Sequence, residues 1–238
     1  MKQILHNFKS GDTKLIDVPK PEVIKGHLLI KSCVSLISTG TEKMLVDFGK
    51  SNLLGKAKQQ PEKVKMVIDK IKTEGLLLTL DNVRKKLDKS IPLGYCNVGE
   101  IVDIGSNSSQ KFKIGDKVVN NGAHAEFVNV PPNLCAKVPN NVTDEEAAFT
   151  VISSVALQGI RLSDPKIGET YAVIGLGLVG LITVQLLAAN GCNVIGMDYD
   201  KSRLEMAEIF GAKTIDLSKE KSPHVVTNNL TKANGVDA

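Results

Sequence analysis

Aromatic residues and cysteines are scarce in this sequence. None of its 238 residues is tryptophan, only 4% are aromatic, and the four cysteines lie far apart without a Cys-x-x-Cys pair. Disulfide-rich secreted folds and zinc lobes built from four cysteines both need cysteines at short, regular spacings. The sequence therefore argues against both classes, and we expect a protein of the reducing cytoplasm.

The sequence also gives no reason to expect a secretory leader or an uninterrupted membrane segment. The first residues, Met1–Ile4, show no charged-then-apolar pattern of the kind that directs secretion. The stretch between Glu169 and Asp198 carries no charge and is long enough to resemble a transmembrane helix. Glycines and asparagines interrupt it, however, and a parallel strand buried on both faces is itself continuously apolar. We therefore expect no membrane span.

The overall composition is that of an ordinary globular protein. The hydrophobic fraction is 42%, the charged fraction is 24% and the net charge is +4. Ten basic and five acidic residues fall between Lys56 and Lys89, so this segment carries the positive excess and the remainder of the chain is close to neutral. The length suffices for one large domain or two medium ones.

The basic segment is expected to be helical. Two short helices are predicted, each with apolar residues on its inner face: Val64, Val67, Ile68 and Ile71 after Pro61, then Leu80, Val83 and Leu87 after Thr79. The lysine-rich faces would then point outward, either as solvated surface or as a site for an anionic substrate or an acidic partner. Aromatic residues that stack on bases are absent from the segment, so we expect no nucleic-acid binding.

A β-α-β unit is predicted in the second half of the chain. A short apolar run, Tyr171–Ile174, passes directly into Gly175-x-Gly177-x-x-Gly180, and apolar residues then recur at helical spacing as far as Gly191. A second apolar run, Val194–Met197, ends at Asp198. The order is therefore strand, glycine loop, helix, strand and acid.

This order suits dinucleotide binding. A diphosphate reaches the free N–H groups of a helix start only where the loop carries no side chains, and an acid after the second strand accepts hydrogen bonds from the ribose. Asp198 favours NAD because it would repel a 2′-phosphate, although Lys201 and Arg203 lie close enough to leave NADP open. The candidate cofactor-binding residues are Gly175, Leu176, Gly177, Leu178, Val179, Gly180, Asp198, Tyr199 and Arg203.

Two domains are expected. Short strands are predicted before residue 38 and between residues 99 and 130, with the helical segment inserted between them. A capping box, Thr143-x-x-Glu146, then begins a helix that leads towards the β-α-β unit. We predict a β-barrel domain at residues 1–142, with its insertion at about 43–91, and a nucleotide-binding domain at residues 143–238.

With these residues in view, the sequence resembles the medium-chain dehydrogenase/reductase superfamily, of the zinc-type alcohol dehydrogenase kind. The resemblance spans nearly the whole chain and includes Val173–Gly180 and Val194–Asp198. It implies an α/β fold, in which a GroES-like β-barrel domain with a helical insertion precedes a Rossmann doubly wound parallel sheet. Only about half of that sheet is present, so we expect a partial Rossmann domain and a truncated chain.

A narrower resemblance is to the N-terminal part of bacterial bi-domain oxidoreductases. It rests on the helical insertion and on Pro92–Gly99. In those proteins a second oxidoreductase, of the glucose-fructose oxidoreductase type, follows the first. The resemblance implies a small-molecule substrate, and it leaves open both a homodimer and a fused or associated second oxidoreductase domain.

The residues that bind zinc in the superfamily are replaced in this sequence. Ser38-Thr39-Gly40-Thr41-Glu42 stands where zinc-dependent members place Cys-Gly-Thr-Asp, Gly94-Tyr95-Cys96 stands where they place Gly-His-Glu, and Ile152 lies near the third ligand position. Hydroxyl groups are poor zinc ligands compared with thiolate and imidazole. We therefore expect no metal.

Without zinc, a carbonyl would be polarised by hydrogen-bond donors or by the conjugation of the substrate itself. Tyr95, Ser38 and Thr39 occupy positions that resemble the lost ligands, so they are the candidate donors, unless they are simply packed polar residues. His124 is either a proton relay or a structural histidine. Cys96 is a weaker candidate nucleophile, because no neighbouring feature would lower its pKa.

These inferences predict a zinc-independent NAD(P)-dependent oxidoreductase that moves a hydride to or from a small carbonyl, alcohol or enone. The bi-domain resemblance suggests a sugar derivative as the substrate. The alternative is a non-catalytic dinucleotide-binding module, or an inactive fragment of a larger bi-domain oxidoreductase.

Overall fold

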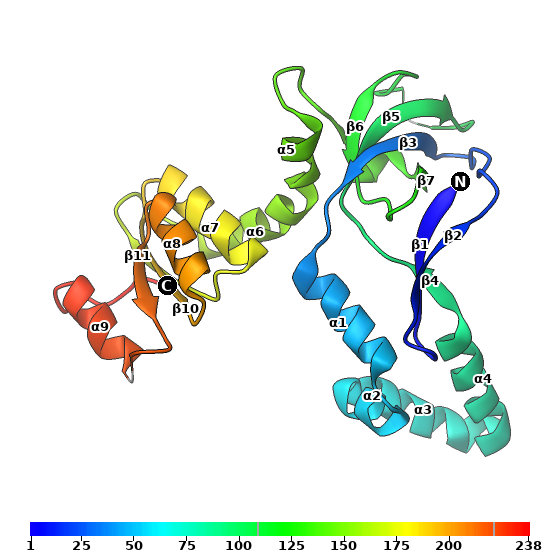
Figure 1. Ribbon diagram of the computed structural model, residues 1–238, viewed down its shortest axis with the longest axis horizontal. Helices are drawn as coiled ribbons and strands as arrows, with labels where there is room; N and C mark the ends of the chain where they lie inside the picture. The colour runs from blue at the N-terminus through cyan, green and yellow to red at the C-terminus, as the bar shows by residue number, and fades with distance from the viewer. Residues whose placement is uncertain (109, 221) are drawn as a thin grey trace. The chain divides into compact units, whose positions relative to one another are not determined.

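The computed structural model describes residues 1–108, 110–220 and 222–238, and within these ranges it describes every side chain except those at positions 53, 54, 74, 76–78, 80, 84 and 86. The chain divides into two compact units, Met1–Phe149 and Thr150–Ala238 (Figure 1). In the described part of the chain, no helix is both long enough and apolar enough to cross a membrane.

The first unit contains two antiparallel sheets. The smaller sheet has the order β2-β1-β4, from Thr13–Asp17, Lys2–Asn7 and Ser90–Pro92. The larger has the order β7-β3-β5-β6-β8, from Phe127–Val130, Leu28–Ser35, Asn97–Ile104, Lys117–Asn120 and Cys135–Lys137, with the short 3-10 helix η1 (Pro132–Leu134) before β8. The core of the larger sheet consists of Leu28, Ile30, Ile101, Val118, Val128 and Val130. Alternating apolar residues along these strands face that core, as expected for a GroES-like barrel.

A helical insertion separates β3 from β4. It comprises α1 (Thr39–Lys50), α2 (Leu53–Gln59), α3 (Pro61–Glu74) and α4 (Leu76–Asp88). The predicted helix after Pro61 is confirmed, and the second helix begins at Leu76, three residues before the predicted Thr79. Gly75, which separates the two, has a positive φ of 86° that few other residues adopt readily.

The predicted inner face of the insertion is only partly confirmed. Val64, Val67 and Ile71 are half-buried, and so are Val83 and Leu87, whereas the Leu80 side chain lies outside the described residues. Ile68 was predicted to face inward but is 49% exposed. The reason is that α3 packs mainly on its neighbouring helices α2 and α4, which cover a narrower stripe than a full core would.

The second unit is built around a parallel sheet of three strands. Strands β9 (Thr170–Ile174), β10 (Asn193–Asp198) and β11 (Lys213–Asp216) are arranged in the order β11-β10-β9. The helices of this unit are α6 (Thr150–Ser163), α7 (Leu178–Ala189), α8 (Lys201–Ile209) and α9 (Pro223–Leu230). Val184 and Leu187 of α7 pack with Tyr171, Leu176 and Val194 in the core. The β-α-β unit and the partial Rossmann sheet are therefore confirmed.

The two units divide after a short helix that belongs to the barrel. The predicted capping box is present, because Glu146 N–H donates to Thr143 Oγ1 at 3.2 Å and Thr143 N–H donates to Glu146 Oε2 at 2.9 Å. It begins α5 (Asp144–Ala148), which packs against β3 and β5. This packing keeps α5 in the first unit, and the division at residues 149 and 150 falls seven positions after the predicted boundary.

Candidate functional site

The glycine loop between β9 and α7 is shaped by two different constraints. Gly175 has a φ of 89°, which makes the turn out of the strand and is unfavourable for other residues. A Cβ atom at position 180 would lie 2.0 Å from the carbonyl oxygen of Gly175, so a side chain there cannot fit. A Cβ atom at Gly177 would meet no protein atom within 4 Å. The chain itself therefore needs glycine at positions 175 and 180, while position 177 borders open space.

The start of α7 provides unpaired N–H groups beside this open space. Gly177 is the residue before the first helical turn and supplies no side-chain cap. The first hydrogen bond of the helix runs from Leu181 N–H to Gly177 C=O at 2.8 Å, so the N–H groups of Leu178, Val179 and Gly180 have no partner within the helix. Such N–H groups, at the positive end of a helix, suit an anion such as a diphosphate.

Asp198 joins the end of β10 to the glycine loop. Its Oδ2 accepts a hydrogen bond from Leu176 N–H at 2.7 Å, and its Oδ1 accepts one from Asp200 N–H at 2.9 Å. Burial opposes ionisation of the carboxyl, but these N–H groups and the nearby Arg203 guanidinium outweigh it, so the pKa of Asp198 lies below its ordinary value. Asp198 is therefore an ionised acceptor in contact with the loop.

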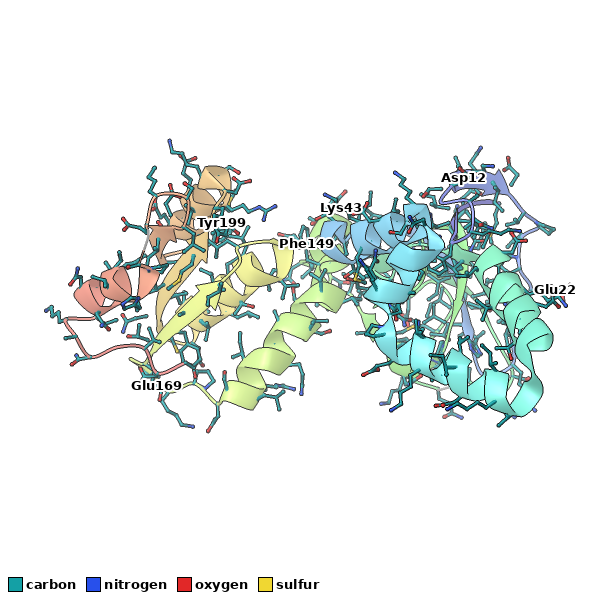
Figure 2. The ribbon with its side chains drawn as sticks, turned by 90° about the horizontal axis from the view of Figure 1, so that it is seen from below. Asp12, Glu22, Lys43, Phe149, Glu169 and Tyr199 are labelled. Atoms are coloured by element: carbon teal, nitrogen blue, oxygen red, sulfur yellow. The ribbon has the colours of Figure 1, made fainter. Side chains whose placement is uncertain are left out.

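The remaining cofactor candidates lie at the surface of the same unit. Tyr199 is 71% exposed (Figure 2). Arg203, at the start of α8, places Nη1 3.7 Å from Asp198 Oδ2 and Nε 3.7 Å from Asp200 Oδ2. Its guanidinium is thus already engaged by two carboxylates, which reduces the positive charge offered to a 2′-phosphate.

In the first unit, the structure brings two of the predicted catalytic residues together. The hydroxyl of Tyr95 donates to Ser38 Oγ at 2.7 Å and lies 3.4 Å from Thr41 Oγ1. Tyr95 is half-buried and Ser38 is buried. Thr39 is exposed in the first turn of α1, and Thr41 rather than Thr39 is the second hydroxyl near Tyr95.

The predicted residue His124 is part of a neighbouring buried cluster. Its Nε2 lies 3.0 Å from Glu42 Oε2 and its Nδ1 lies 2.8 Å from Ser35 Oγ. Glu42 Oε1 accepts a hydrogen bond from Ser38 N–H at 2.9 Å, which links this cluster to the hydroxyl pair. Sequence reasoning missed Glu42 and Ser35. The sequence signal that could have identified Glu42 was a glutamate in the first turn of a helix that begins at a serine.

A network of amides holds the loop that carries His124. Asn120 Nδ2 donates to Asn97 Oδ1 at 3.1 Å, and Asn97 Nδ2 donates to Ser32 Oγ at 2.7 Å. Gly122 N–H donates to Asn120 Oδ1 at 2.8 Å. Because buried amides are stable only when paired, this network fixes the backbone just before His124.

The side chains at the positions that resemble the zinc ligands of the superfamily do not fit that metal. Ser38 and Tyr95 offer hydroxyls, and Ile152 lies buried in α6 with no donor atom. The side chains of His124 and Glu42 are of types that bind zinc, but together they provide only two ligands. In the part of the chain that the structure describes, no group of three or more His, Cys, Asp or Glu side chains could hold a metal ion.

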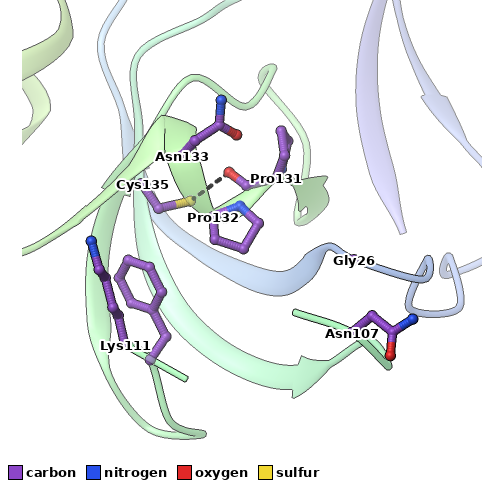
Figure 3. A pocket seen from close by; sticks show the side chains of 8 residues that line it. Gly26, Asn107, Lys111, Pro131, Pro132, Asn133 and Cys135 are labelled. Atoms are coloured by element: carbon purple, nitrogen blue, oxygen red, sulfur yellow. Dashed lines mark hydrogen bonds between the residues drawn. The ribbon is translucent and has the colours of Figure 1, made fainter. Parts of the chain in front are cut away.

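A separate hollow of about 520 Å³ lies in the first unit, lined by Gly26, Asn107, Lys111, Phe112, Pro131, Pro132, Asn133 and Cys135 (Figure 3). The thiol of Cys135 donates to the carbonyl oxygen of Pro131 at 3.6 Å. Burial raises the pKa of this thiol to about 11. Cys135 is therefore protonated near neutral pH and poorly suited to act as a nucleophile.

Comparison with known proteins bears on this arrangement. No family model matches the chain. (R,R)-butanediol dehydrogenase of Bacillus subtilis is 28% identical over 157 residues, which is 54% of this chain and 45% of that protein. Sorbitol dehydrogenase of Rattus norvegicus is 26% identical over 235 residues, which is 94% of this chain and 63% of that protein.

Solved structures share the fold. The crystal structure of 2R,3R-butanediol dehydrogenase from Bacillus subtilis gives a TM-score of 0.74 at 20% identity, covering 99% of this chain and 68% of that one. Escherichia coli quinone oxidoreductase complexed with NADPH gives a TM-score of 0.74 at 16% identity, covering 99% and 64%.

Antiparallel GroES-like sheets followed by a partial Rossmann sheet are the fold that this chain shares with alcohol dehydrogenases of solved structure. The chain is similar in sequence to dehydrogenases of the medium-chain dehydrogenase/reductase superfamily and shares their fold. It spans less than two thirds of the length of the two curated relatives described above.

Proposed function

We propose that this chain is part of a zinc-independent NAD(P)-dependent oxidoreductase that acts on a small carbonyl, alcohol or enone. One observation carries the proposal: the 2.7 Å bond from Leu176 N–H to Asp198 Oδ2 ties the glycine loop to the acid. It places the uncapped start of α7 and an ionised carboxylate at the same end of the sheet, as dinucleotide binding requires.

The residues of the second unit fit the cofactor. The N–H groups at the start of α7 would hold the diphosphate, with Gly177 leaving room for its approach. Each oxygen of Asp198 accepts one hydrogen bond from the backbone and has capacity for another, from the ribose. A bound nicotinamide dinucleotide supplies or accepts the hydride. We favour NAD over NADP because Asp198 is ionised and would repel a 2′-phosphate.

The first unit would handle the proton. In carbonyl reduction, Tyr95 would donate its hydroxyl proton to the oxygen of the substrate as the hydride reaches the carbonyl carbon. Ser38 Oγ, 2.7 Å from the phenol oxygen, could then turn its own hydrogen towards Tyr95 and stabilise the phenolate. Alcohol oxidation would run the same steps in reverse. A sugar derivative as substrate, a homodimer, and a fused or associated second oxidoreductase domain are further parts of this proposal.

The second candidate function is a non-catalytic dinucleotide-binding module. The replacement of zinc ligands by the hydroxyls of Ser38 and Tyr95 favours it, because the same substitutions would follow from a loss of chemistry. NADH binding without turnover across a broad panel of carbonyl and alcohol substrates would select this candidate. Turnover with any member of the panel would select the oxidoreductase.

The cofactor site is tested by two alanine substitutions in the same loop. Gly180→Ala should lower the free energy of unfolding by about 1–3 kcal/mol, because its Cβ would collide with the Gly175 carbonyl. Gly177→Ala should change it by less than about 1 kcal/mol, yet weaken NADH binding about tenfold, because its methyl group would meet the diphosphate. Thermal unfolding and NADH fluorescence titration measure the two effects. Equal NADH affinity of Gly177→Ala and wild type would contradict the proposed site.

A further inference from the structure

Glu42 is the one buried acid among the described residues of the first unit. A carboxylate is costly to bury unless hydrogen bonds replace its lost water. Glu42 has two such partners, Ser38 N–H at 2.9 Å from Oε1 and His124 Nε2 at 3.0 Å from Oε2. Ser38 also accepts the hydrogen bond of the Tyr95 hydroxyl, and the His124 ring packs against Gly94, the residue before Tyr95, so the position of this carboxylate bears on the proposed proton donor.

The first hydrogen bond of Glu42 acts on Ser38. A serine that precedes a helix ordinarily caps it with its hydroxyl, but Ser38 makes no side-chain cap. Glu42 reaches back to bind the backbone N–H of Ser38 instead. The Ser38 hydroxyl is thereby left to accept the hydrogen bond from Tyr95.

The second hydrogen bond of Glu42 acts on Tyr95 through the imidazole ring of His124. His124 is held at both ring nitrogens, by Glu42 and by Ser35 Oγ at 2.8 Å. The ring lies directly against Gly94, where an added Cβ would be 2.7 Å from three ring atoms. Gly94 immediately precedes Tyr95 and has a φ of 92°, so the fixed ring sets the backbone from which the phenol projects.

We infer that Glu42 is a positioning residue that sets the Tyr95–Ser38 hydroxyl pair, holding Ser38 through its N–H group and Tyr95 through His124 and Gly94. The inference rests on the proposed function for its role in catalysis. Placement of a proton donor matters because an error of about 1 Å can cost on the order of a hundredfold in rate.

The test is Glu42→Gln in the full 238-residue chain, with Asp47→Asn as the control. Asp47 is an exposed acid on the same helix. In Glu42→Gln the introduced amide oxygen can still accept from Ser38 N–H, but the amide nitrogen can only donate to His124. This contact therefore favours the His124 tautomer in which Nε2 accepts and Nδ1 carries the proton.

Nuclear magnetic resonance of the histidine and tyrosine side chains measures this change without cofactor or substrate. We expect the ¹⁵N signal of His124 Nε2 to move to the unprotonated range in Glu42→Gln and the ¹³Cζ signal of Tyr95 to shift. The signals of Tyr171 and Tyr199 should stay in place, and Asp47→Asn should match the wild type. His124→Gln and Tyr95→Phe assign the two signals. An unchanged Tyr95 signal in Glu42→Gln would overturn the inference.

Kinetics provide the second measurement. Glu42→Gln should lower kcat on the order of tenfold to a hundredfold while KM for the cofactor is unchanged, because the cofactor residues belong to the other unit. A wild-type kcat in this variant would also overturn the inference.

Should Glu42→Gln fail to fold, Ser35→Ala provides a second variant, because it removes the hydrogen-bond partner of His124 at the other end of the same cluster. Ser35→Ala must shift the Tyr95 signal for the inference to stand. If the wild type turns over no substrate, the proposed function fails, while the Tyr95 signal still decides the role of Glu42.

Discussion

Buried ionisable residues are satisfied in different ways in the two units. Asp198 receives hydrogen bonds from two backbone N–H groups, whereas Glu42 receives one from the backbone and one from His124. His6 differs from both. Its side chain is fully buried, Nδ1 lies 2.9 Å from Thr13 Oγ1, and Nε2 has no hydrogen-bond partner among the described residues. The His6 ring instead faces the backbone of α1 at Gly49.

His6 should make the stability of the protein depend on pH. Burial is the main reason why its pKa lies below the ordinary value of 6.5, and Lys50 adds to this effect against opposing contributions from Asp12 and the Leu45 backbone. Because the unfolded chain binds the proton more readily, stability should be fully present above about pH 6.5 and fall as the pH drops towards the folded pKa.

We expect the wild type to lose more of its free energy of unfolding than His6→Gln between pH 7 and pH 5. Urea unfolding at several pH values measures the difference between the two proteins. The other titrating groups are present in both the wild type and the variant, so their contributions to the pH dependence cancel in the comparison. Parallel stability profiles for wild type and variant would show that His6 is not the group responsible.

At the scale of elements, α1 positions the candidate proton-handling site. It begins at Ser38 and carries Thr41 and Glu42 in its first turn. Its C-terminal end is fixed by Lys56 of α2, whose Nζ donates to Gly49 C=O at 2.8 Å and Ser51 C=O at 2.7 Å. Lys56 is buried, so it does not belong to the outward lysine-rich face predicted for the basic segment.

Removal of the Lys56 ammonium group should therefore weaken α1. In Lys56→Met the two carbonyl groups at the helix end lose their partner, and we expect the free energy of unfolding to fall by about 1–3 kcal/mol. Lys58→Met, an exposed position on the same helix α2, is the matched control and should stay within about 0.5 kcal/mol of the wild type. Denaturant titration compares the two, and equal effects would show that the Lys56 hydrogen bonds contribute little.

At the scale of the whole molecule, the two units carry separable parts of the proposed reaction. The cofactor candidates belong to the second unit, and the hydroxyl pair with Glu42 and His124 belongs to the first. The helical insertion contributes α1 to the first unit and also exposes lysines, among them Lys63 and Lys65 on α3. Besides a site for an anionic substrate, these lysines have two interpretations, a solvated face and a surface for an acidic partner.

Charge reversal on α3 distinguishes the two interpretations. If the surface binds an acidic partner or a second copy, Lys63→Glu with Lys65→Glu should reduce the mass of the assembly in sedimentation velocity and leave NADH affinity unchanged. Lys25→Glu with Lys31→Glu, exposed residues of the same unit outside the insertion, should have no such effect. An unchanged mass in the α3 variant would favour a solvated face.

The sequence by itself determined the features that depend on near neighbours along the chain. The glycine loop at Gly175–Gly180, the capping box at Thr143 and the order of the β-α-β unit follow from local backbone requirements, which residue types satisfy directly. The resemblance to the superfamily could be seen in the sequence for the same reason, since the motifs that carry it are short and contiguous.

Only the tertiary structure decided which distant side chains meet. Tyr95 and Ser38 are separated by 57 positions, His124 and Glu42 by 82, and His124 and Ser35 by 89. No local pattern specifies such pairs, because residues so far apart in the sequence meet only when the strands and helices of the first unit have packed. The same holds for the burial of Lys56 and for the nearness of Thr41, rather than Thr39, to Tyr95, since burial and contact are properties of the packed molecule.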